Sequence, residues 1–258
     1  MHAGSVQMAH FGAADLRIDK KGTIDLVTNI DVAIEREFRA LIAERFPDHV
    51  VLGEEFANST DDAVPEYCWV FDPIDGTTNY AHGLPIFCCS VALELNGAPL
   101  VAAVYDPNRR ELFTAERGHG AWLNGAPIKV SSTGTLIDSL LVTGFHYNVQ
   151  RDPAELMGLF TKFITTSRAV RRLGSAALDL CYVAAGRFEG FWEQKLHAWD
   201  VAGGSLIVQE AGGRVTGVDG SPYSSRSGSV LATNGHVHDE MLDTIRTFQQ
   251  SWAASQKP

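Results

Sequence analysis

The sequence WVFDPIDGTTNY occupies residues 69–80 and joins an apolar segment to a polar turn. Residues 67–71 are aromatic or apolar, which predicts a buried strand that ends at Asp72. Pro73 fixes its own backbone angle and favours an extended conformation at Asp72. The Asp72 and Asp75 carboxylates are therefore expected to converge from a stiff turn at the end of a core strand.

The residue types in this turn suit a metal ion beside a phosphate group. Mg²⁺ prefers oxygen ligands and is commonly held by one or two carboxylates, waters and a substrate phosphate. Gly76, Thr77 and Thr78 add backbone N–H groups and hydroxyls, which can bind phosphate if a helix begins there. From these residues alone, a polar turn without any ligand is an open alternative.

Further carboxylates lie at the ends of other expected elements. Asp31 falls in the first turn of a helix, which the apolar repeat between residues 34 and 46 predicts. Glu54 and Glu55 follow a short apolar strand, and Asp200 begins another predicted helix. Each also has a simple structural explanation, because Asp31 and Asp200 could cap their helices and paired glutamates are often solvated.

Composition narrows the class of protein. The chain has 258 residues, of which 45% are hydrophobic and 20% charged, so it can bury a large core in one domain or two closely packed halves. Its net charge of −10 disfavours nucleic-acid binding and suits a protein that gathers cations. The four cysteines show no C-x-x-C spacing and are expected to be reduced, buried thiols. With no membrane span or signal peptide apparent, a cytoplasmic location is expected.

The predicted elements differ between the two halves of the chain. Residues 1–140 are expected to form an α+β half with the metal-binding turn and an antiparallel meander, whose strands are predicted at 87–95, 100–105, 112–114, 121–123 and 128–130. Asn-Gly pairs at 96–97 and 124–125 predict tight hairpins. Residues 141–258 alternate helices and strands, and are expected to form an α/β half that completes the site.

Two sequence signatures resemble those of the inositol monophosphatase family of Mg²⁺-dependent, lithium-sensitive phosphomonoesterases. The first is DPIDGTTN at residues 72–79, and the second combines WDVAG at 199–203 with EAGG at 210–213. The segments VTNID at 27–31 and GEE at 53–55 also resemble the family pattern. The resemblance implies a layered α/β (α+β) sandwich of alternating helix and sheet layers, like inositol monophosphatase and fructose-1,6-bisphosphatase, in a homodimer.

The resemblance also implies a role for each site residue. A first Mg²⁺ would be held by Glu54, Asp72 and the Ile74 carbonyl, and a second by Asp72, Asp75 and Asp200, with a third, weaker ion near Glu54. Asp31 and Thr77 would orient and activate the attacking water, and Glu54 is counted with them as catalytic. Phosphate would bind at Gly76 and Thr77. The inositol ring would contact Ala176, Glu193, Asp75 and Asp200.

The function implied is hydrolysis of myo-inositol monophosphate to inositol and phosphate by a metal-activated water. The residues themselves favour metal-assisted chemistry, because no Ser-His-Asp or reactive-cysteine arrangement is visible in the sequence. Fructose-1,6-bisphosphate, histidinol phosphate or another small phosphate ester is an alternative substrate. A protein that keeps the metal site only for stability or for binding a partner is the alternative from a different class.

Overall fold

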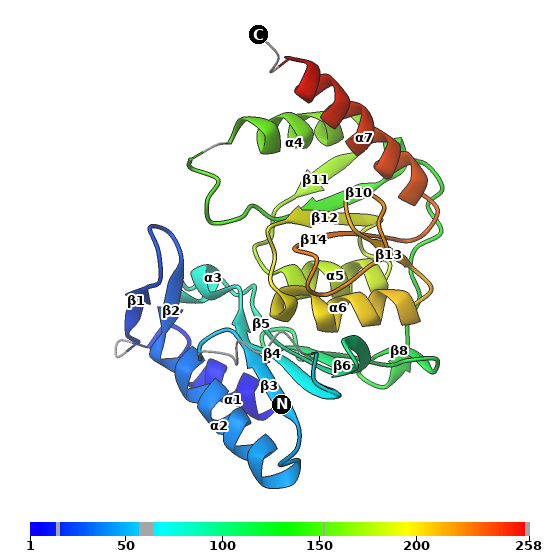
Figure 1. The fold of residues 1–258 in the computed structure, drawn as a ribbon. Coiled ribbons are helices and arrows are strands. Elements are labelled where there is room, and N and C mark those ends of the chain that lie inside the picture. Colours follow the sequence, from blue (N-terminus) through cyan, green and yellow to red (C-terminus); the bar gives the residue numbers. More distant parts are fainter. Residues whose placement is uncertain (14–15, 57–63, 152, 256–258) are drawn as a thin grey trace.

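The computed structural model describes residues 1–13, 16–56, 64–151 and 153–255. Within these ranges, the two larger sheets are separated by one layer of helices and each is covered on its other face by further helices (Figure 1), and β1 (Ile18–Lys20) and β2 (Leu26–Thr28) form a third, two-stranded sheet. The layered sandwich of alternating helices and sheets that the sequence predicts is confirmed. No helix in the described ranges is long and apolar enough to cross a bilayer.

The first sheet has seven strands in the order β3-β4-β5-β6-β7-β8-β9. Their bounds are β3 Val50–Gly53, β4 Tyr67–Asp75, β5 Cys88–Leu95, β6 Ala98–Asp106, β7 Glu111–Glu116, β8 Gly120–Leu123 and β9 Ala126–Pro127. From β4 onward the strands pair antiparallel with their sequence neighbours, as predicted. The Asn96-Gly97 and Asn124-Gly125 hairpins are also confirmed, with positive φ at all four residues.

The predicted strand at residues 128–130 is wrong. The strand pairing of β9 ends at Pro127, which has no N–H to donate to a ladder. Ile128 N still donates to Ala121 O at 3.0 Å, but Val130 N donates to Ala211 O at 3.2 Å. The chain therefore leaves the sheet to contact a distant helix end, which local sequence patterns do not reveal.

The second sheet has five strands in the order β11-β10-β12-β14-β13. The strands are β10 Leu140–Thr143, β11 Ala169–Arg171, β12 Gly190–Gln194, β13 Arg214–Thr216 and β14 Ser229–Thr233. Strand β10 runs parallel to β11 and β12, whereas β14 is antiparallel to both of its neighbours. The parallel pairs are connected through α4 (Ala154–Thr166) and α5 (Ala176–Ala184).

The helices α5 and α6 (Ala198–Glu210) lie between the sheets. The two helices can approach closely because Gly204 has no side chain. A Cβ at this position would lie 2.6 Å from the Leu180 Cβ, so only glycine fits there. The outer layers are α1 (His2–His10) with α2 (Asn29–Arg45) on the first sheet, and α4 with α7 (His238–Ser255) on the second.

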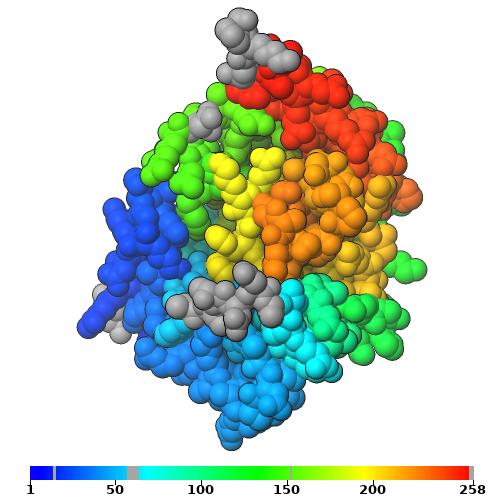
Figure 2. Space-filling view, viewed as in Figure 1, coloured from blue at the N-terminus to red at the C-terminus, as the bar shows by residue number. Residues whose placement is uncertain are grey.

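The main hydrophobic core draws on both halves of the chain. It joins first-sheet residues such as Val70 and Phe113 to Leu178 of α5, Ile207 of α6 and Phe191 of the second sheet. Figure 2 shows the N-terminal region in blue and the C-terminal helix in red at opposite ends of the molecule. Because the two halves share this core, the structure does not separate them into two domains, and the predicted division at residue 140 stays a prediction.

Candidate active site

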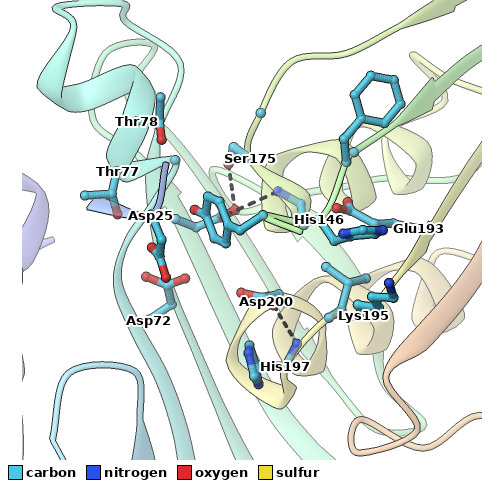
Figure 3. Close-up of a pocket in the computed structure, with 18 of the residues that line it drawn as sticks. Asp25, Asp72, Thr77, Thr78, His146, Ser175, Glu193, Lys195, His197 and Asp200 are labelled. Atoms are coloured by element: carbon cyan, nitrogen blue, oxygen red, sulfur yellow. Dashed lines mark hydrogen bonds between the residues drawn. The ribbon is translucent and has the colours of Figure 1, made fainter. Parts of the chain in front are cut away.

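A cavity of about 510 Å³ lies where the end of β4 meets the starts of α5 and α6. Figure 3 shows Asp72 and Thr77 on one side of it, with Ser175, Glu193 and Asp200 on the other. Of the residues predicted for the site, the following line the cavity: Glu54, Asp72, Ile74, Asp75, Gly76, Thr77, Ala176, Glu193 and Asp200. Asp31 is the one predicted residue that does not.

The turn that carries Asp72 and Asp75 is part of the sheet. The predicted strand end at Asp72 is wrong, because β4 continues to Asp75 and its register with β5 shifts between these two residues. Gly76 then has φ +100° and precedes α3 (Thr77–Ala81). A side chain at Gly76 would be strained in this conformation and would bring a Cβ within 2.9 Å of Ile86 O.

Gln7 of α1 supports this irregular part of the sheet from the side opposite the cavity. Its fully buried side chain donates from Nε2 to Pro73 O at 2.7 Å and to Cys88 O at 3.2 Å. The Tyr80 hydroxyl in turn donates to Gln7 O at 2.7 Å. Helix α1 therefore supplies donors to two carbonyl groups at the place where β4 and β5 change register.

We expect Gln7→Leu to lower the free energy of unfolding by about 1–2 kcal/mol, because two buried carbonyl groups lose a donor. Urea denaturation measures the change. Ser5→Ala is the control on the same helix, since Ser5 is exposed and its hydroxyl donates to Met1 O, at the N-cap of α1. A Gln7→Leu protein as stable as the wild type would show that the register shift needs no support from α1.

Three aspartates of the predicted site, Asp72, Asp75 and Asp200, are each oriented by a backbone or hydroxyl donor. Asp72 Oδ1 accepts from Ile74 N at 2.9 Å. Asp75 Oδ2 accepts from Ser175 Oγ at 2.6 Å and from Ala177 N at 2.7 Å, at the start of α5. Asp200 Oδ2 accepts from His197 N at 2.6 Å and so caps α6. The capping role considered for Asp200 is thus real and fixes its position at the cavity.

The carboxylates raise one another's pKa values. Burial is the main cause at Asp72 and Asp200, whose pKa values lie well above the ordinary range, and the neighbouring charge of Glu54 is the next. Burial likewise raises the pKa of Glu54. The positive charge of Lys21 partly balances these carboxylates, since its Nζ lies 3.0 Å from Glu54 Oε1 and 2.7 Å from Glu55 Oε2.

The donor set fits Mg²⁺ by its chemistry, because buried carboxylate oxygens with unbalanced charge are the ligands that a hard divalent cation prefers. The geometry is less complete. As the side chains stand, no three His, Cys, Asp or Glu residues in the described ranges lie close enough to hold one ion together. The predicted ligands therefore line one cavity, and their side chains would have to turn toward a shared ion to enclose it, so their binding of metal stays a prediction.

Asp31 lies behind Thr77 and is fully buried. Thr77 Oγ1 lies 3.3 Å from Asp31 Oδ1 and donates to Ile74 O at 2.9 Å. Asp31 also closes the capping box at the start of α2, where Oδ2 accepts from Thr28 N at 2.9 Å and from the Thr28 hydroxyl. Burial raises the Asp31 pKa to about 7. Asp31 is both a helix cap and a partner of the cavity-lining hydroxyl.

The far end of the cavity is formed by Glu193 and Ala176. Burial raises the Glu193 pKa to about 8, and the nearby Arg172 charge opposes this shift. Gly144 faces Glu193, and a Cβ there would collide with its carboxylate. Gly144 therefore leaves room for the buried Glu193 carboxyl group, which could accept a hydrogen bond from a hydroxyl of a bound ligand.

Several lining residues were missed by the sequence analysis. Lys21 and Asp25 enter from the turn between β1 (Ile18–Lys20) and β2 (Leu26–Thr28), and Asp25 Oδ1 has no hydrogen-bond partner in the described part of the chain. His146, Tyr147, Arg172, Ser175 and Lys195 also line the cavity. Only Ser175 carried a signal, since a serine before a helix is a typical N-cap type.

The cysteines are free, as expected. Cys88 lies nearest the cavity residues, with Sγ 3.7 Å from Asp75 Oδ2. Burial and the Asp75 charge raise its pKa well above the ordinary value, so the thiolate is disfavoured. This environment argues against a cysteine nucleophile at this site.

The raised carboxyl pKa values predict how stability depends on pH. Ordinary values are 3.8 for Asp and 4.5 for Glu, whereas the folded values are about 6 at Asp75, 7 at Asp31 and 8 at Glu193. The folded state therefore binds protons more tightly than the unfolded state, and this contribution to stability is lost as the pH rises through about 6 to 8. Without metal, we expect Tm to fall over this range.

Added Mg²⁺ should counter this loss, since cations bind deprotonated carboxylates. The rise in Tm on adding Mg²⁺ should consequently be larger at about pH 8 than at about pH 6. Differential scanning fluorimetry measures both quantities. An equal or smaller Mg²⁺ effect at the higher pH would mean that these carboxylates are not where the ion binds.

Comparison with known proteins identifies the group of proteins to which this site belongs. The model of the inositol monophosphatase family matches residues 1–252. The chain belongs to the inositol monophosphatase family. An inositol-1-monophosphatase from Synechocystis is 43% identical over 92% of this chain and 84% of its own length. The structure of an Anabaena inositol monophosphatase is 40% identical, with a TM-score of 0.84 over 95% of this chain and 91% of its own.

The family also contains relatives with a different kind of name. The Nus factor SuhB of Pasteurella multocida is 41% identical over 90% of this chain and 86% of its own length. Relatives named as inositol monophosphatases and relatives named as Nus factors are thus about equally similar to this chain. Membership of the inositol monophosphatase family is confirmed, whereas the substrate is not decided by similarity.

Proposed function

We propose that this protein hydrolyses myo-inositol monophosphate to inositol and phosphate with the help of two or three Mg²⁺ ions. The single observation that carries the proposal is the common cavity, in which carboxylates from three distant parts of the chain lie around the Gly76-Thr77 turn. Family membership and the names of the cyanobacterial relatives support the same activity.

The site residues have separate roles in binding metal, phosphate and the inositol ring. Glu54, Asp72 and the Ile74 carbonyl would hold the first ion, and Asp72, Asp75 and Asp200 the second, with a third near Glu54. Bound Mg²⁺ supplies Lewis-acid stabilisation and lowers the pKa of a bound water. Gly76 and Thr77 bind the phosphate. Ala176, Glu193, Asp75 and Asp200 contact the inositol ring.

Thr77 and Asp31 activate the attacking water. The water gives a proton to Thr77 Oγ1 as its oxygen attacks phosphorus, and the Thr77 proton passes to Asp31 Oδ1, 3.3 Å away. For this the Thr77 hydroxyl turns from its present acceptor, Ile74 O. The burial that raises the Asp31 pKa makes this carboxylate a better proton acceptor. The bond from phosphorus to the inositol oxygen breaks, and that oxygen takes a proton from solvent to give inositol.

A phosphate-release panel with Mg²⁺ tests the proposal. Inositol 1-phosphate should give a higher kcat/KM than fructose-1,6-bisphosphate or histidinol phosphate, EDTA should abolish release, and lithium should inhibit it. A much higher kcat/KM for another ester would show that inositol monophosphate is not the preferred substrate. Light scattering tests the proposed homodimer, and cell fractionation tests the cytoplasmic location.

A non-catalytic role is the second candidate, because relatives named Nus factor are as similar as the named phosphatases. The contact of Thr77 with Asp31 argues for catalysis, since neither side chain is needed merely to hold a metal. Absence of any phosphomonoester cleavage by Mg²⁺-loaded protein would favour the binding role. The prediction that no nucleic acid is bound rests on net charge alone and would then need a direct binding assay.

A further inference from the structure

A carboxylate outside the cavity holds the segment that carries Glu54. Glu35 lies on α2, one helical turn beyond Asp31, and its side chain is fully buried. It is not among the residues that line the cavity. Burying a carboxylate is costly unless its oxygens are well paired, so the partners of Glu35 show what it is used for.

Those partners are two backbone N–H groups that follow Gly53 and the guanidinium of Arg39. Glu35 Oε2 accepts from Glu55 N at 2.7 Å, and Oε1 accepts from Phe56 N at 3.3 Å and from Arg39 Nε at 2.8 Å. Arg39 Nη1 then donates to Val51 O at 3.1 Å. Glu35 and Arg39 together fix the backbone before and after Glu54.

The sequence at the end of β3 is adapted to this contact. Gly53 lies against the Glu35 carboxylate, and a Cβ at this position would collide with both oxygens and with Cδ. Glycine therefore lets Glu35 reach the N–H groups that follow. The buried carboxylate and the glycine form one local arrangement, in which the path of the backbone through Glu54 is tightly constrained.

We propose that Glu35 is a positioning residue for metal binding. By holding the backbone of Glu55 and Phe56, it sets where the Glu54 side chain enters the cavity and hence how tightly Mg²⁺ binds there. Asp31 and Glu35 are on the same face of α2, so one helix places the water-activating carboxylate and the Glu54 segment relative to each other. This inference rests on the proposed function.

The chain offers a matched control in Glu94 of β5. Glu94 is also fully buried, its Oε2 lies 2.6 Å from Arg226 Nη1, and its Oε1 accepts from Ser225 Oγ at 2.6 Å. Glu94 does not line the cavity. Glu35→Gln and Glu94→Gln therefore make the same chemical change in buried glutamate–arginine pairs, and only the first lies next to Glu54.

Both variants should have a lower Tm than the wild type. Only Glu35→Gln should raise the Mg²⁺ concentration for half-maximal activity, by about tenfold, with kcat restored at saturating Mg²⁺. It should also need more Mg²⁺ to reach the wild-type rise in Tm, a measurement that does not depend on turnover. Glu35→Asp, which shortens the reach of the carboxylate, should behave similarly and replaces Glu35→Gln if that variant does not fold.

Wild-type Mg²⁺ dependence in the Glu35 variants would overturn the inference, as would an equal shift in Glu94→Gln. The two proposals fail differently. Mg²⁺-dependent stabilisation without phosphatase activity would remove the proposed function, and the Tm titration would still decide the role of Glu35. If Mg²⁺ changes neither activity nor Tm in the wild type, Glu35 has no metal site to position and the inference falls too.

Discussion

Asp200→Asn is expected to reduce kcat at least about 100-fold while leaving the fold intact, since loss of a direct ligand should exceed the effect of losing an outer partner. The asparagine amide keeps an oxygen that can accept from His197 N, so α6 should still be capped. The substitution removes a carboxyl group whose ionisation is opposed by burial and by the charges of Glu54 and Asp75. Tm without metal should therefore not fall, whereas the rise in Tm on adding Mg²⁺ should shrink.

Asp106→Asn is the matched control for Asp200. Asp106 is fully buried and, like Asp200, accepts from backbone N–H groups, here Asn108 N at 2.9 Å and Arg109 N at 3.0 Å, but it does not line the cavity. We expect a lower Tm and an unchanged response to Mg²⁺. Wild-type turnover and Mg²⁺ response in Asp200→Asn would contradict the assignment of two metal ions.

Thr77→Val should lower kcat by about 100-fold or more, because the shape is kept and the proton-relaying hydroxyl is removed. The hydroxyl is the group that contacts both Ile74 O and Asp31 Oδ1. The Mg²⁺ concentration for half-maximal activity should stay close to the wild-type value, since no metal ligand changes. Thr77→Ser keeps a hydroxyl and should retain most of the activity.

Asp31→Asn tests whether the two side chains act as a unit. If they do, the double variant with Thr77→Val should be no slower than the slower single variant, whereas independent roles would give multiplied losses. Because Asp31 also caps α2, Tm must be measured alongside kcat. Unchanged turnover in Asp31→Asn would eliminate its role in activating water.

Local patterns in the sequence predicted where helices and strands form better than they predicted what those elements pack against. The apolar repeat of α2 predicts a helix, and Ile34 and Ile42 are buried as expected, yet Leu41 is 43% exposed and Phe46 40%. The repeat shows that one face is apolar but not how far the neighbouring sheet extends over it. In the same way, β4 continues past Pro73 because β5 and Gln7 provide partners from elsewhere in the chain.

The amino-acid sequence alone was enough to determine the family, the alternation of helices and sheets, and five carboxylates that line the cavity, Glu54, Asp72, Asp75, Glu193 and Asp200, because motifs and hydrophobic periodicity are local properties of a chain. Only the tertiary structure decided that Asp31 lies behind Thr77, that Lys21 and Asp25 reach the cavity, and that Glu35 holds the backbone around Glu54. These contacts join residues that are distant in sequence and have no shared motif. Their partners are selected by packing and by the need to pair buried charges, which arise only when the layers come together.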